Sequence, residues 1–389
     1  MALWLIMAVS VLYVLFFALA SLLPRNLRTQ KKDFRPQTND LSTFLVLFPA
    51  YKEDAVIRTS VETFLKQDYP SERYQVVVIS DHMTDETNAC LAQKPITLLT
   101  PQFDKSSKAR ALQYAVHYAQ QTMNDELCTI NYVVILDADN IVASDFLSRI
   151  NVECQKGYRA IQCHRTAKNA DSDVAALDGL SEEINNSIFR RGHNRVGLSS
   201  ALIGSGMCFD YGWFCANVDN LDSAVEDREL EALLMQQDIY IHYAEDILVM
   251  DEKVSNGDNF QRQRLRWMTG QVQTLFRMAP YLPKAFFTGN INYIDKTLQQ
   301  ALIPRSILIV LTTMLALLVT VAKPAWCVKW WALVAALAIG LFVAIPKQLR
   351  TQTVFSKVIA LPGMVFRMVC NLARIERKNT EFLHTEHGK

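Results

Sequence analysis

The segment YVVILDADN, residues 132–140, constrains the fold of this chain more than any other stretch. Its first five residues are aliphatic or aromatic, and a continuous apolar run of this length is typical of a strand buried on both faces. Two carboxylates, Asp137 and Asp139, follow the run directly. Ligands of α/β sheets bind at the carboxyl ends of the strands, where two acids need a cation or a hydrogen-bond network. The segment therefore predicts an α/β fold with a functional site just after this strand.

The stretches around this strand alternate between short apolar runs and segments with helical periodicity. The apolar runs predict strands at residues 44–48, 75–80, 96–99 and 160–163. The helical segments lie at residues 57–66, 84–91, 108–121, 144–154, 173–191, 227–237 and 259–278. This alternation indicates a mainly parallel, doubly wound, Rossmann-like α/β sheet. No G-x-G-x-x-G sequence follows the first predicted strand, which argues against a dinucleotide-binding domain.

Length and charge narrow the class of protein further. The 389 residues are too many for one ordinary hydrophobic core. The formal net charge of +1 gives no bulk attraction to nucleic acid, so no nucleic-acid partner is expected. Eight cysteines occur without a C-x-x-C pair, and they are expected to be small buried side chains in a reducing compartment.

Three long stretches carry no charged residue, at residues 1–24, 306–322 and 330–346. The first is long enough to span a bilayer, and a signal peptide is the alternative. Basic residues follow it directly, from Arg25 to Lys32. By the positive-inside rule they place the amino terminus outside and the middle of the chain in the cytoplasm. The other two stretches predict a helical hairpin across the membrane.

The apolar stretches divide the chain into four parts. The expected domains are a transmembrane helix at 1–24, a cytoplasmic α/β domain at 40–280, a transmembrane hairpin at 300–346 and a cytoplasmic tail at 347–389. Charges and a proline interrupt residues 354–372, which favours an interfacial helix over a third carboxy-terminal span. We therefore expect an integral membrane protein in contact with lipids.

Three acidic motifs are separated in the sequence but suit one kind of chemistry. Asp81 directly follows a predicted strand and is placed to accept hydrogen bonds from a base or a ribose. Asp137 and Asp139 offer hard oxygen ligands that suit Mg²⁺ or Mn²⁺ bound through a substrate diphosphate. Asp227 follows Glu226 at the start of a predicted helix. It is either a general base that takes a proton from an acceptor hydroxyl or an acid that stabilises the helix dipole.

A fourth motif, QRLRW at residues 263–267, is basic and aromatic. Gln263, Arg264 and Arg266 offer polar and cationic groups, and the guanidinium group suits phosphate recognition. Trp267 offers an indole N–H and an aromatic face for a sugar. The alternative is a basic helix that lies on lipid headgroups beside the predicted hairpin.

Together the motifs resemble those of the inverting family-two glycosyltransferases, which have a GT-A fold. The resemblance is to the membrane-embedded branch that includes cellulose, chitin, hyaluronan and poly-N-acetylglucosamine synthases. That branch shows, in order, the motifs found here as Asp81, Asp137-Ala138-Asp139, Glu226-Asp227 and Gln263-Arg264-Leu265-Arg266-Trp267. PAYKED at 49–54 and KARALQYA at 108–115 are similar to two further family segments, with Lys52 and Gln113 in place of Asn. The resemblance covers about residues 45–270.

The resemblance implies a nucleotide-binding role for one group of residues. Tyr51, Glu53 and Asp81 would contact the uracil or ribose of a UDP-sugar. Lys108 would lie near the same nucleotide.

It implies catalytic and metal-binding roles for a second group. Asp137 would contact the nucleotide or sugar, or share the metal, and Asp139 would hold Mg²⁺ or Mn²⁺ on the diphosphate. Asp227 would be the base. The glutamine, the arginines and the tryptophan of QRLRW would hold the diphosphate and the acceptor sugar.

The resemblance has limits that bear on function. The chain lacks the F-x-V-T-x-K sequence that marks cellulose synthases, and it has fewer predicted spans than long-chain secreting synthases. We expect an inverting hexosyltransferase of a bacterial inner membrane that serves polysaccharide biosynthesis in the cell envelope. It would move a sugar from a nucleotide-sugar, UDP-linked, onto a growing glycan or a lipid-linked acceptor, with export or assembly proteins as candidate partners. The alternatives are single addition to a polyprenyl-phosphate-linked sugar and a non-catalytic membrane scaffold.

Overall fold

The computed structural model describes residues 2–25, 41–122, 129–169, 172–223, 225–253 and 257–350, without the side chains of residues 257–264. The predicted interfacial helix at 354–372 lies outside the described residues, as does most of the basic segment after the first span.

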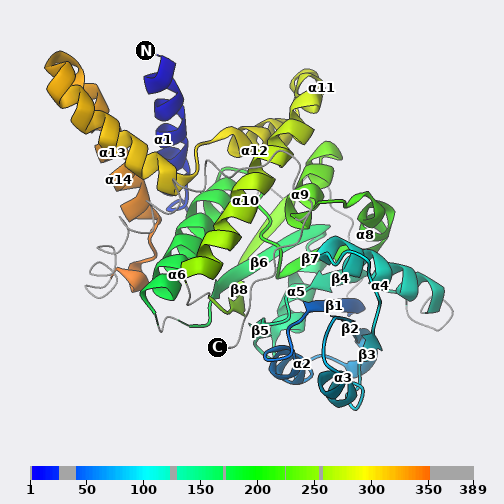
Figure 1. Cartoon of the computed structure of the whole chain (residues 1–389). Coiled ribbons are helices and arrows are strands. Elements are labelled where there is room, and N and C mark those ends of the chain that lie inside the picture. The colour runs from blue at the N-terminus through cyan, green and yellow to red at the C-terminus, as the bar shows by residue number, and fades with distance from the viewer. Residues whose placement is uncertain are drawn as a thin grey trace.

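Within the described residues, eight strands form one mixed sheet in the order β3-β2-β1-β4-β7-β6-β8-β5 (Figure 1). The strands are β1 Phe44–Tyr51, β2 Tyr74–Asp81, β3 Thr97–Leu99, β4 Tyr132–Ile135, β5 Ile141–Val142, β6 Ala160–Ala167, β7 Met207–Asp210 and β8 Ile241–Asp251. Strand β1 is parallel to β2 and β4, β2 is parallel to β3, and β6 is parallel to β8. Strand β7 is antiparallel to β4 and β6, and β5 is antiparallel to β8. The predicted α/β fold with a mainly parallel sheet is therefore confirmed.

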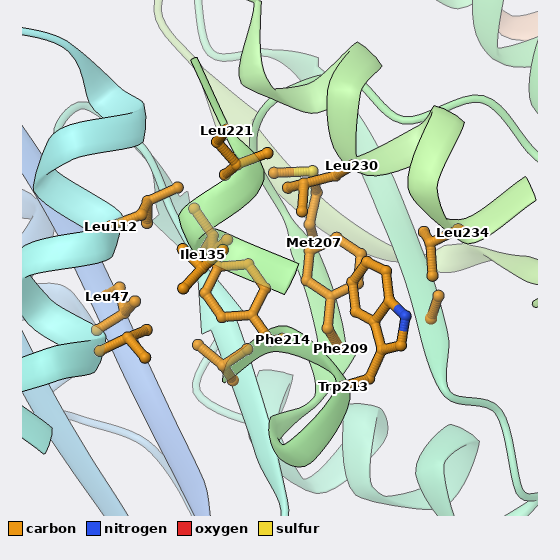
Figure 2. Close-up of a cluster of buried hydrophobic side chains, with 14 of the residues drawn as sticks. Leu47, Leu112, Ile135, Met207, Phe209, Trp213, Phe214, Leu221, Leu230 and Leu234 are labelled. Atoms are coloured by element: carbon orange, nitrogen blue, oxygen red, sulfur yellow. The ribbon is translucent and has the colours of Figure 1, made fainter. Parts of the chain in front are cut away.

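Helices cover both faces of the sheet, as the alternation of buried side chains along the strands requires. These helices are α2 Ile57–Phe64, α3 Asp85–Leu91, α4 Lys108–Thr122, α5 Phe146–Gln155, α8 Tyr211–Asn217, α9 Glu226–Gln236 and α10 Gly257–Met278. Leu45 and Leu47 of β1 point into a core with α4, α8 and α9, whereas Phe44 and Phe48 point into a core with α2 and α5. Figure 2 shows Leu47, Leu112, Ile135, Phe209 and Phe214 meeting in the first of these cores.

Strands β5, β7 and β8 have no counterpart among the predicted elements, and β8 is the longest of them. The first four residues of β8 are buried, but its second half alternates between buried and exposed positions. Glu245 and Asp246 interrupt the apolar run, so no continuous signal marks the strand. The pairing of β8 with β6 is also irregular: Cys163 pairs with Ala244, but the next residue, His164, pairs with Leu248. This shift in register interrupts the pattern of buried side chains along β8.

The prediction of one continuous α-helix at residues 173–191 is wrong. The structure has α6 at Asp173–Asn185, a π-helical segment η3 at Asn186–Gly192 and a short α7 at His193–Arg195. Gly192 packs so closely on the first helix that a Cβ atom there would lie 2.3 Å from the carbonyl oxygen of Phe17. The sequence periodicity does not report this contact. π-helical segments are rare and occur mostly as single turns inside α-helices, as here between α6 and α7.

Three apolar helices are long enough to cross a membrane among the described residues: α1 Ala2–Ala20, α13 Arg305–Ala322 and a segment from Pro324 that contains α14 Cys327–Ala344. They lie together beside the sheet domain (Figure 1). The Trp4 indole N–H donates to the Lys329 carbonyl, so the start of α1 lies at the turn between α13 and α14. At the other end Arg25, which follows α1, lies 3.2 Å from Asp246 of the sheet domain.

Helix α12, Ile291–Ala301, was not predicted and connects the sheet domain to α1. The Tyr13 hydroxyl of α1 donates to Asp295 Oδ1 of α12 at 2.7 Å and lies 2.9 Å from His193 Nε2. Gln299 Nε2 lies 3.0 Å from the same His193 nitrogen, and the His193 ring stacks on Phe17 with centroids 3.6 Å apart. A short helix α11, Leu282–Thr288, leads into α12. Helix α1 is therefore hydrogen-bonded into the domain through a buried polar cluster.

Candidate active site

The carboxyl ends of β1, β2, β4 and β8 open into one cavity of about 870 Å³. Nine of the eleven predicted site residues line it: Tyr51, Glu53, Asp81, Lys108, Asp137, Asp139, Asp227, Arg266 and Trp267. The other two, Gln263 and Arg264, belong to α10, and their side chains lie outside the described residues. The cavity brings together side chains that are up to 216 residues apart, from Tyr51 to Trp267.

The two aspartates after β4 are fixed by a tight network. Asn140 Oδ1 accepts a hydrogen bond from the Asp137 N–H at 3.0 Å, and Asn140 Nδ2 donates to Asp139 Oδ1 at 3.1 Å. The second oxygen of Asp139 accepts the N–H of Glu252 at 2.8 Å. Asp139 is 3% exposed, so its carboxylate is held at the base of the cavity.

Negative charge accumulates at this end of the cavity. Burial, and then the carboxylates of Asp251 and Asp137, raise the pKa of Asp139 well above its ordinary value. Burial, and then Asp139 and Asp137, raise the pKa of Glu53 to about 9. When burial and neighbouring carboxylates raise a pKa in this way, a nearby cation stabilises the ionised form of the carboxyl group.

The residues of the site fit a divalent cation of a particular kind. Among the described residues, no group of three or more His, Cys, Asp or Glu side chains could hold a metal ion. Mg²⁺ and similar hard cations are commonly bound by one or two carboxylates together with substrate phosphates and water. Asp137 and Asp139 line the cavity as two neighbouring carboxylates, and they match that donor set.

Lys108 connects two of the motifs across the cavity. It lies at the start of α4, where its ammonium group contacts Asp137 and donates to the Gly204 carbonyl at 2.6 Å. Its Nζ also lies 3.4 Å from Glu226 Oε1. Burial opposes the charged form, but Asp137 and Glu226 outweigh it and raise the pKa of Lys108. Gly204 has a φ of 87°, a backbone conformation that glycine adopts most easily and that turns its carbonyl toward the lysine.

Asp227 lies in the first turn of α9 and faces the same cavity. One of its oxygens accepts the N–H of Arg228 at 2.9 Å. Arg228 in turn contacts Gln300 of α12, which also lines the cavity. The neighbouring Glu226 is buried, and burial raises its pKa even though Lys108 acts in the opposite direction. Asp227 is therefore a half-buried carboxylate in the first turn of a helix that faces the cavity.

Asp81 occupies a second corner of the cavity, at the end of β2. It is 3% exposed, and its Oδ1 lies 2.5 Å from His82 Nδ1. The ring of Tyr51 meets the His82 ring edge-on with centroids 5.6 Å apart. The nearby Asp85 is not among the residues that line the cavity. It is the first residue of α3, and the preceding Thr84 caps that helix by accepting the Thr87 N–H with its hydroxyl.

Sequence reasoning missed a buried ionic network beside the aspartates. Asp251 Oδ2 lies 2.7 Å from Lys253 Nζ and 3.7 Å from Arg165 Nε, and Arg165 Nε donates to Glu182 Oε1 at 2.8 Å. Lys253 also contacts Glu182. Asp251 is the last residue of β8, and β8 runs in the same direction as β4. The carboxyl ends of such strands lie at one edge of the sheet. A prediction of β8 would therefore have placed Asp251 beside Asp137 and Asp139.

Comparisons with known proteins identify the domain that carries this cavity. A family model described as "Glycosyltransferase like family 2" matches residues 42–270, which is more than half of the chain. The chain belongs to this family. The glycosyltransferase match begins just before β1 and ends inside α10, so it contains all eleven predicted site residues.

Curated relatives of this glycosyltransferase include two enzymes named beta-monoglucosyldiacylglycerol synthase. One is from Nostoc sp. (strain PCC 7120) and the other from Trichormus variabilis, and each is 25% identical over 238 residues, or 59% of this chain. The chain spans about half the length of these relatives, 48% in both cases.

A solved structure shares the fold over most of the glycosyltransferase. A mannosyltransferase from Pyrobaculum calidifontis, solved in complex with GDP-Man and Mn²⁺, has a TM-score of 0.51 and 17% sequence identity. The match covers 88% of this chain and 96% of the mannosyltransferase. The domain is therefore a GT-A-like mixed α/β sheet with candidate spans at its amino-terminal and carboxy-terminal sides.

Proposed function

We propose that this glycosyltransferase moves a hexose from a nucleotide-sugar, UDP-linked, onto an acceptor hydroxyl at a membrane, with inversion at the anomeric carbon. The observation that carries the proposal is Lys108, which contacts Asp137 and lies beside Glu226, the neighbour of Asp227. Donor-side and acceptor-side motifs that are about 90 residues apart thereby face one cavity.

The donor would occupy the end formed by β1, β2 and β4. Tyr51, Glu53 and Asp81 supply an aromatic ring and acceptor oxygens for the base and ribose. In the metal-free protein the high pKa of Glu53 leaves it protonated near neutral pH, so there it can also donate a hydrogen bond. Lys108 and Arg266 supply positive charge for the diphosphate.

Mg²⁺ or Mn²⁺, when bound by Asp137 and Asp139, would neutralise charge on the leaving diphosphate. The mannosyltransferase of similar fold was solved with Mn²⁺, which supports a divalent cation here. Arg266 and Trp267, on α10, lie where they can hold the diphosphate and the sugar ring. Gln263 and Arg264, earlier on the same helix, are proposed to join them.

The acceptor would approach from the α9 side. Its hydroxyl oxygen forms a bond to the anomeric carbon while the bond from that carbon to the donor phosphate oxygen breaks. Asp227 takes the hydroxyl proton, and the nucleoside diphosphate leaves. One direct displacement with one base inverts the anomeric carbon, unlike the two-carboxylate arrangement of retaining hydrolases.

We infer the membrane arrangement from the three apolar helices and their connections. The proposed domains are the span at 1–24, the glycosyltransferase domain at 40–280, the hairpin at 300–346 and a tail at 347–389, with domain and tail in the cytoplasm. Arg25 and Lys347 lie at the ends of the spans on the side of the sheet domain, in agreement with the positive-inside rule.

The test is a donor panel applied to the full chain in lipid nanodiscs. UDP-linked and GDP-linked sugars are each incubated with Mn²⁺, with Mg²⁺ or with a chelator, and nucleoside diphosphate release is measured. We expect release from a UDP-sugar that the chelator abolishes. No release from any donor would refute the proposed function, and release that resists the chelator would refute the metal site.

A further inference from the structure

The cavity does not stop at the acids but continues between the apolar helices. Its far part, here called the apolar arm, is lined by Val14, Leu180, Ile184, Ile309, Leu341 and Phe342. These residues come from α1, α6, α13 and α14. Helix α6 contacts both strand β6 and span α14, so it forms the wall between the sheet domain and the spans (Figure 1). One continuous space therefore reaches from Asp139 and Asp227 to the candidate spans.

The chemistry of the apolar arm suits a hydrocarbon chain. Aliphatic and aromatic side chains line much of it, and Ala338 and Leu341 bring it to α14, which is apolar enough to face lipid. Helices α1, α6 and α13 also contribute Ser10, Ser181, Asn185, Arg305 and Ser306 to the cavity. A polar glycan would lose its hydrogen bonds to water along the apolar side chains, at a cost for each hydroxyl buried without a partner. A lipid chain loses nothing by moving from the bilayer into such a space. The acceptor end of the site is thus open to the membrane.

A buried arginine also lines this cavity. Arg190, in η3, lines the cavity and is 4% exposed. Its Nη1 donates to Asn186 Oδ1 at 2.8 Å, but its buried Nε has no hydrogen-bond partner in the described part of the chain. Among the described side chains, no carboxylate lies within 4.0 Å of Arg190, whereas Arg165 has two.

An unpaired buried cation is costly unless a ligand supplies the opposite charge. Glu182, a neighbour of Arg190, is already engaged by Arg165 and Lys253. Glu231, the other acid near it, accepts the Leu202 N–H at 2.9 Å and lies 4.0 Å from Lys296. A guanidinium group in this position is suited to a phosphate group.

We propose that the acceptor is a phosphate-bearing membrane lipid that enters between the spans. Its hydrocarbon chain occupies the apolar arm, its phosphate lies against Arg190, and a hydroxyl of its headgroup reaches Asp227. This assignment rests on the proposed function and names its acceptor class. The hydroxyl gains the sugar and loses its proton to Asp227, and the phosphate of the lipid takes no part in bond changes.

The first test offers acceptors of different chemistry to the full chain in nanodiscs with the best donor. The acceptors are phosphatidylinositol, a polyprenyl-phosphate-linked sugar, diacylglycerol and a soluble oligosaccharide. We expect radiolabel to enter the organic phase with one of the two phosphate-bearing lipids, at least tenfold faster than with the others. Preferred transfer to diacylglycerol or to the soluble oligosaccharide overturns the proposal while the proposed function stands. No nucleotide release with any donor refutes both.

The second test blocks the apolar arm. Ala338 and Ala335 lie on the same helix and are both exposed, but Ala338 lines the cavity and Ala335 does not. Ala338→Trp should raise the KM for the lipid acceptor at least tenfold and leave the KM for the nucleotide-sugar within twofold. Ala335→Trp, the matched control, should leave both constants unchanged. Equal effects of the two substitutions would overturn the assignment of the apolar arm.

The third test addresses Arg190. Arg190→Gln should raise the KM for the phosphate-bearing lipid at least tenfold, and Arg190→Lys should recover part of the loss because it keeps the charge. Thermal unfolding of each variant shows whether it folds. If Arg190→Gln does not fold, the comparison of Arg190→Lys with the wild type decides, because a lysine cannot form the bidentate contact. If Arg190→Gln folds, an unchanged KM for the lipid in that variant overturns the phosphate contact. If Arg190→Gln does not fold, an unchanged KM for the lipid in Arg190→Lys overturns it.

Discussion

Asp227 is the residue on which the proposed chemistry depends most directly. It faces the cavity from the first turn of α9, and its backbone contacts fix its position. Asp227→Asn keeps the shape but removes the base, so we expect sugar transfer to fall by about 10²–10⁴-fold, the usual contribution of a positioned general base. The affinity for the nucleotide-sugar, measured by calorimetry, should not change.

The control for that substitution is Asp222→Asn. Asp222 precedes α9, its side chain is 85% exposed, and its ion pair with Arg277 is long, at 3.8 Å. An exposed pair of this kind contributes little, so transfer should be unaffected. If Asp227→Asn retained wild-type transfer, the base would have to be another residue.

Glu53 makes stability depend on pH in an unusual direction. Its pKa is about 9 in the folded protein and near 4.5 in an unfolded chain, so between these values the folded state holds an extra proton. Stability therefore falls as pH rises from about 4.5 to about 9. In chelator-treated protein, Glu53→Gln should raise the Tm at pH 8 by more than at pH 5. A gain of about 1 kcal/mol would correspond to about 2–4 °C. The same shift at both pH values would contradict the raised pKa.

The residues of the site differ in how far the sequence could predict them. Asp81, Asp137 and Asp139 follow apolar runs directly, so local sequence was enough to place them at strand ends. Arg165 and Glu182 pair across different elements, and their partner Asp251 belongs to a strand with no continuous apolar signal. Long-range ion pairs of this kind follow from topology and not from local pattern.

At the scale of the element, the contact between Gly192 and Phe17 should be sensitive to a single methyl group. Gly192→Ala places a Cβ 2.3 Å from the Phe17 carbonyl oxygen, so α1 and η3 must separate. We expect a loss of about 1–3 kcal/mol, as for overpacked interiors, measured by thermal unfolding in detergent.

Gly212→Ala is the matched substitution for that prediction. Gly212 lies inside α8, and a Cβ there would meet Asp210 Oδ1 at an ordinary 3.6 Å. It should be neutral or slightly stabilising, because alanine is the better helix former. Equal stability of the two variants would contradict the close contact between Gly192 and the Phe17 carbonyl.

The elements themselves were predicted unevenly. Strands β1, β2 and β4 are close to their predicted ranges because each contains a continuous apolar run, and helix α4 is close to its range because its apolar residues recur at helical spacing. The apolar helices α13 and α14 also lie near the predicted hairpin, although α14 starts earlier, inside the expected turn. Helix α12 was missed because its buried face carries Asp295, Lys296 and Gln300, which look like surface residues in the sequence.

At the scale of the whole molecule, the proposed membrane topology can be checked by labelling. Lys323 lies at the turn between α13 and α14, and Glu72 lies on the surface of the sheet domain. In intact cells, a membrane-impermeant maleimide should label Lys323→Cys and should label Glu72→Cys only after the membrane is opened. The native cysteines are first replaced so that the signal is specific. The reverse labelling pattern would invert the proposed orientation.

The buried cluster of Tyr13, His193 and Asp295 makes the first helix more than an interchangeable anchor. A foreign apolar helix in its place would supply enough hydrophobic length but no hydroxyl, and it would leave His193 and Asp295 facing each other without their third member. Chimaeras that exchange amino-terminal spans between relatives should therefore work only where the tyrosine travels with the helix. The same dependence means that the catalytic domain and its anchor would have to diversify together.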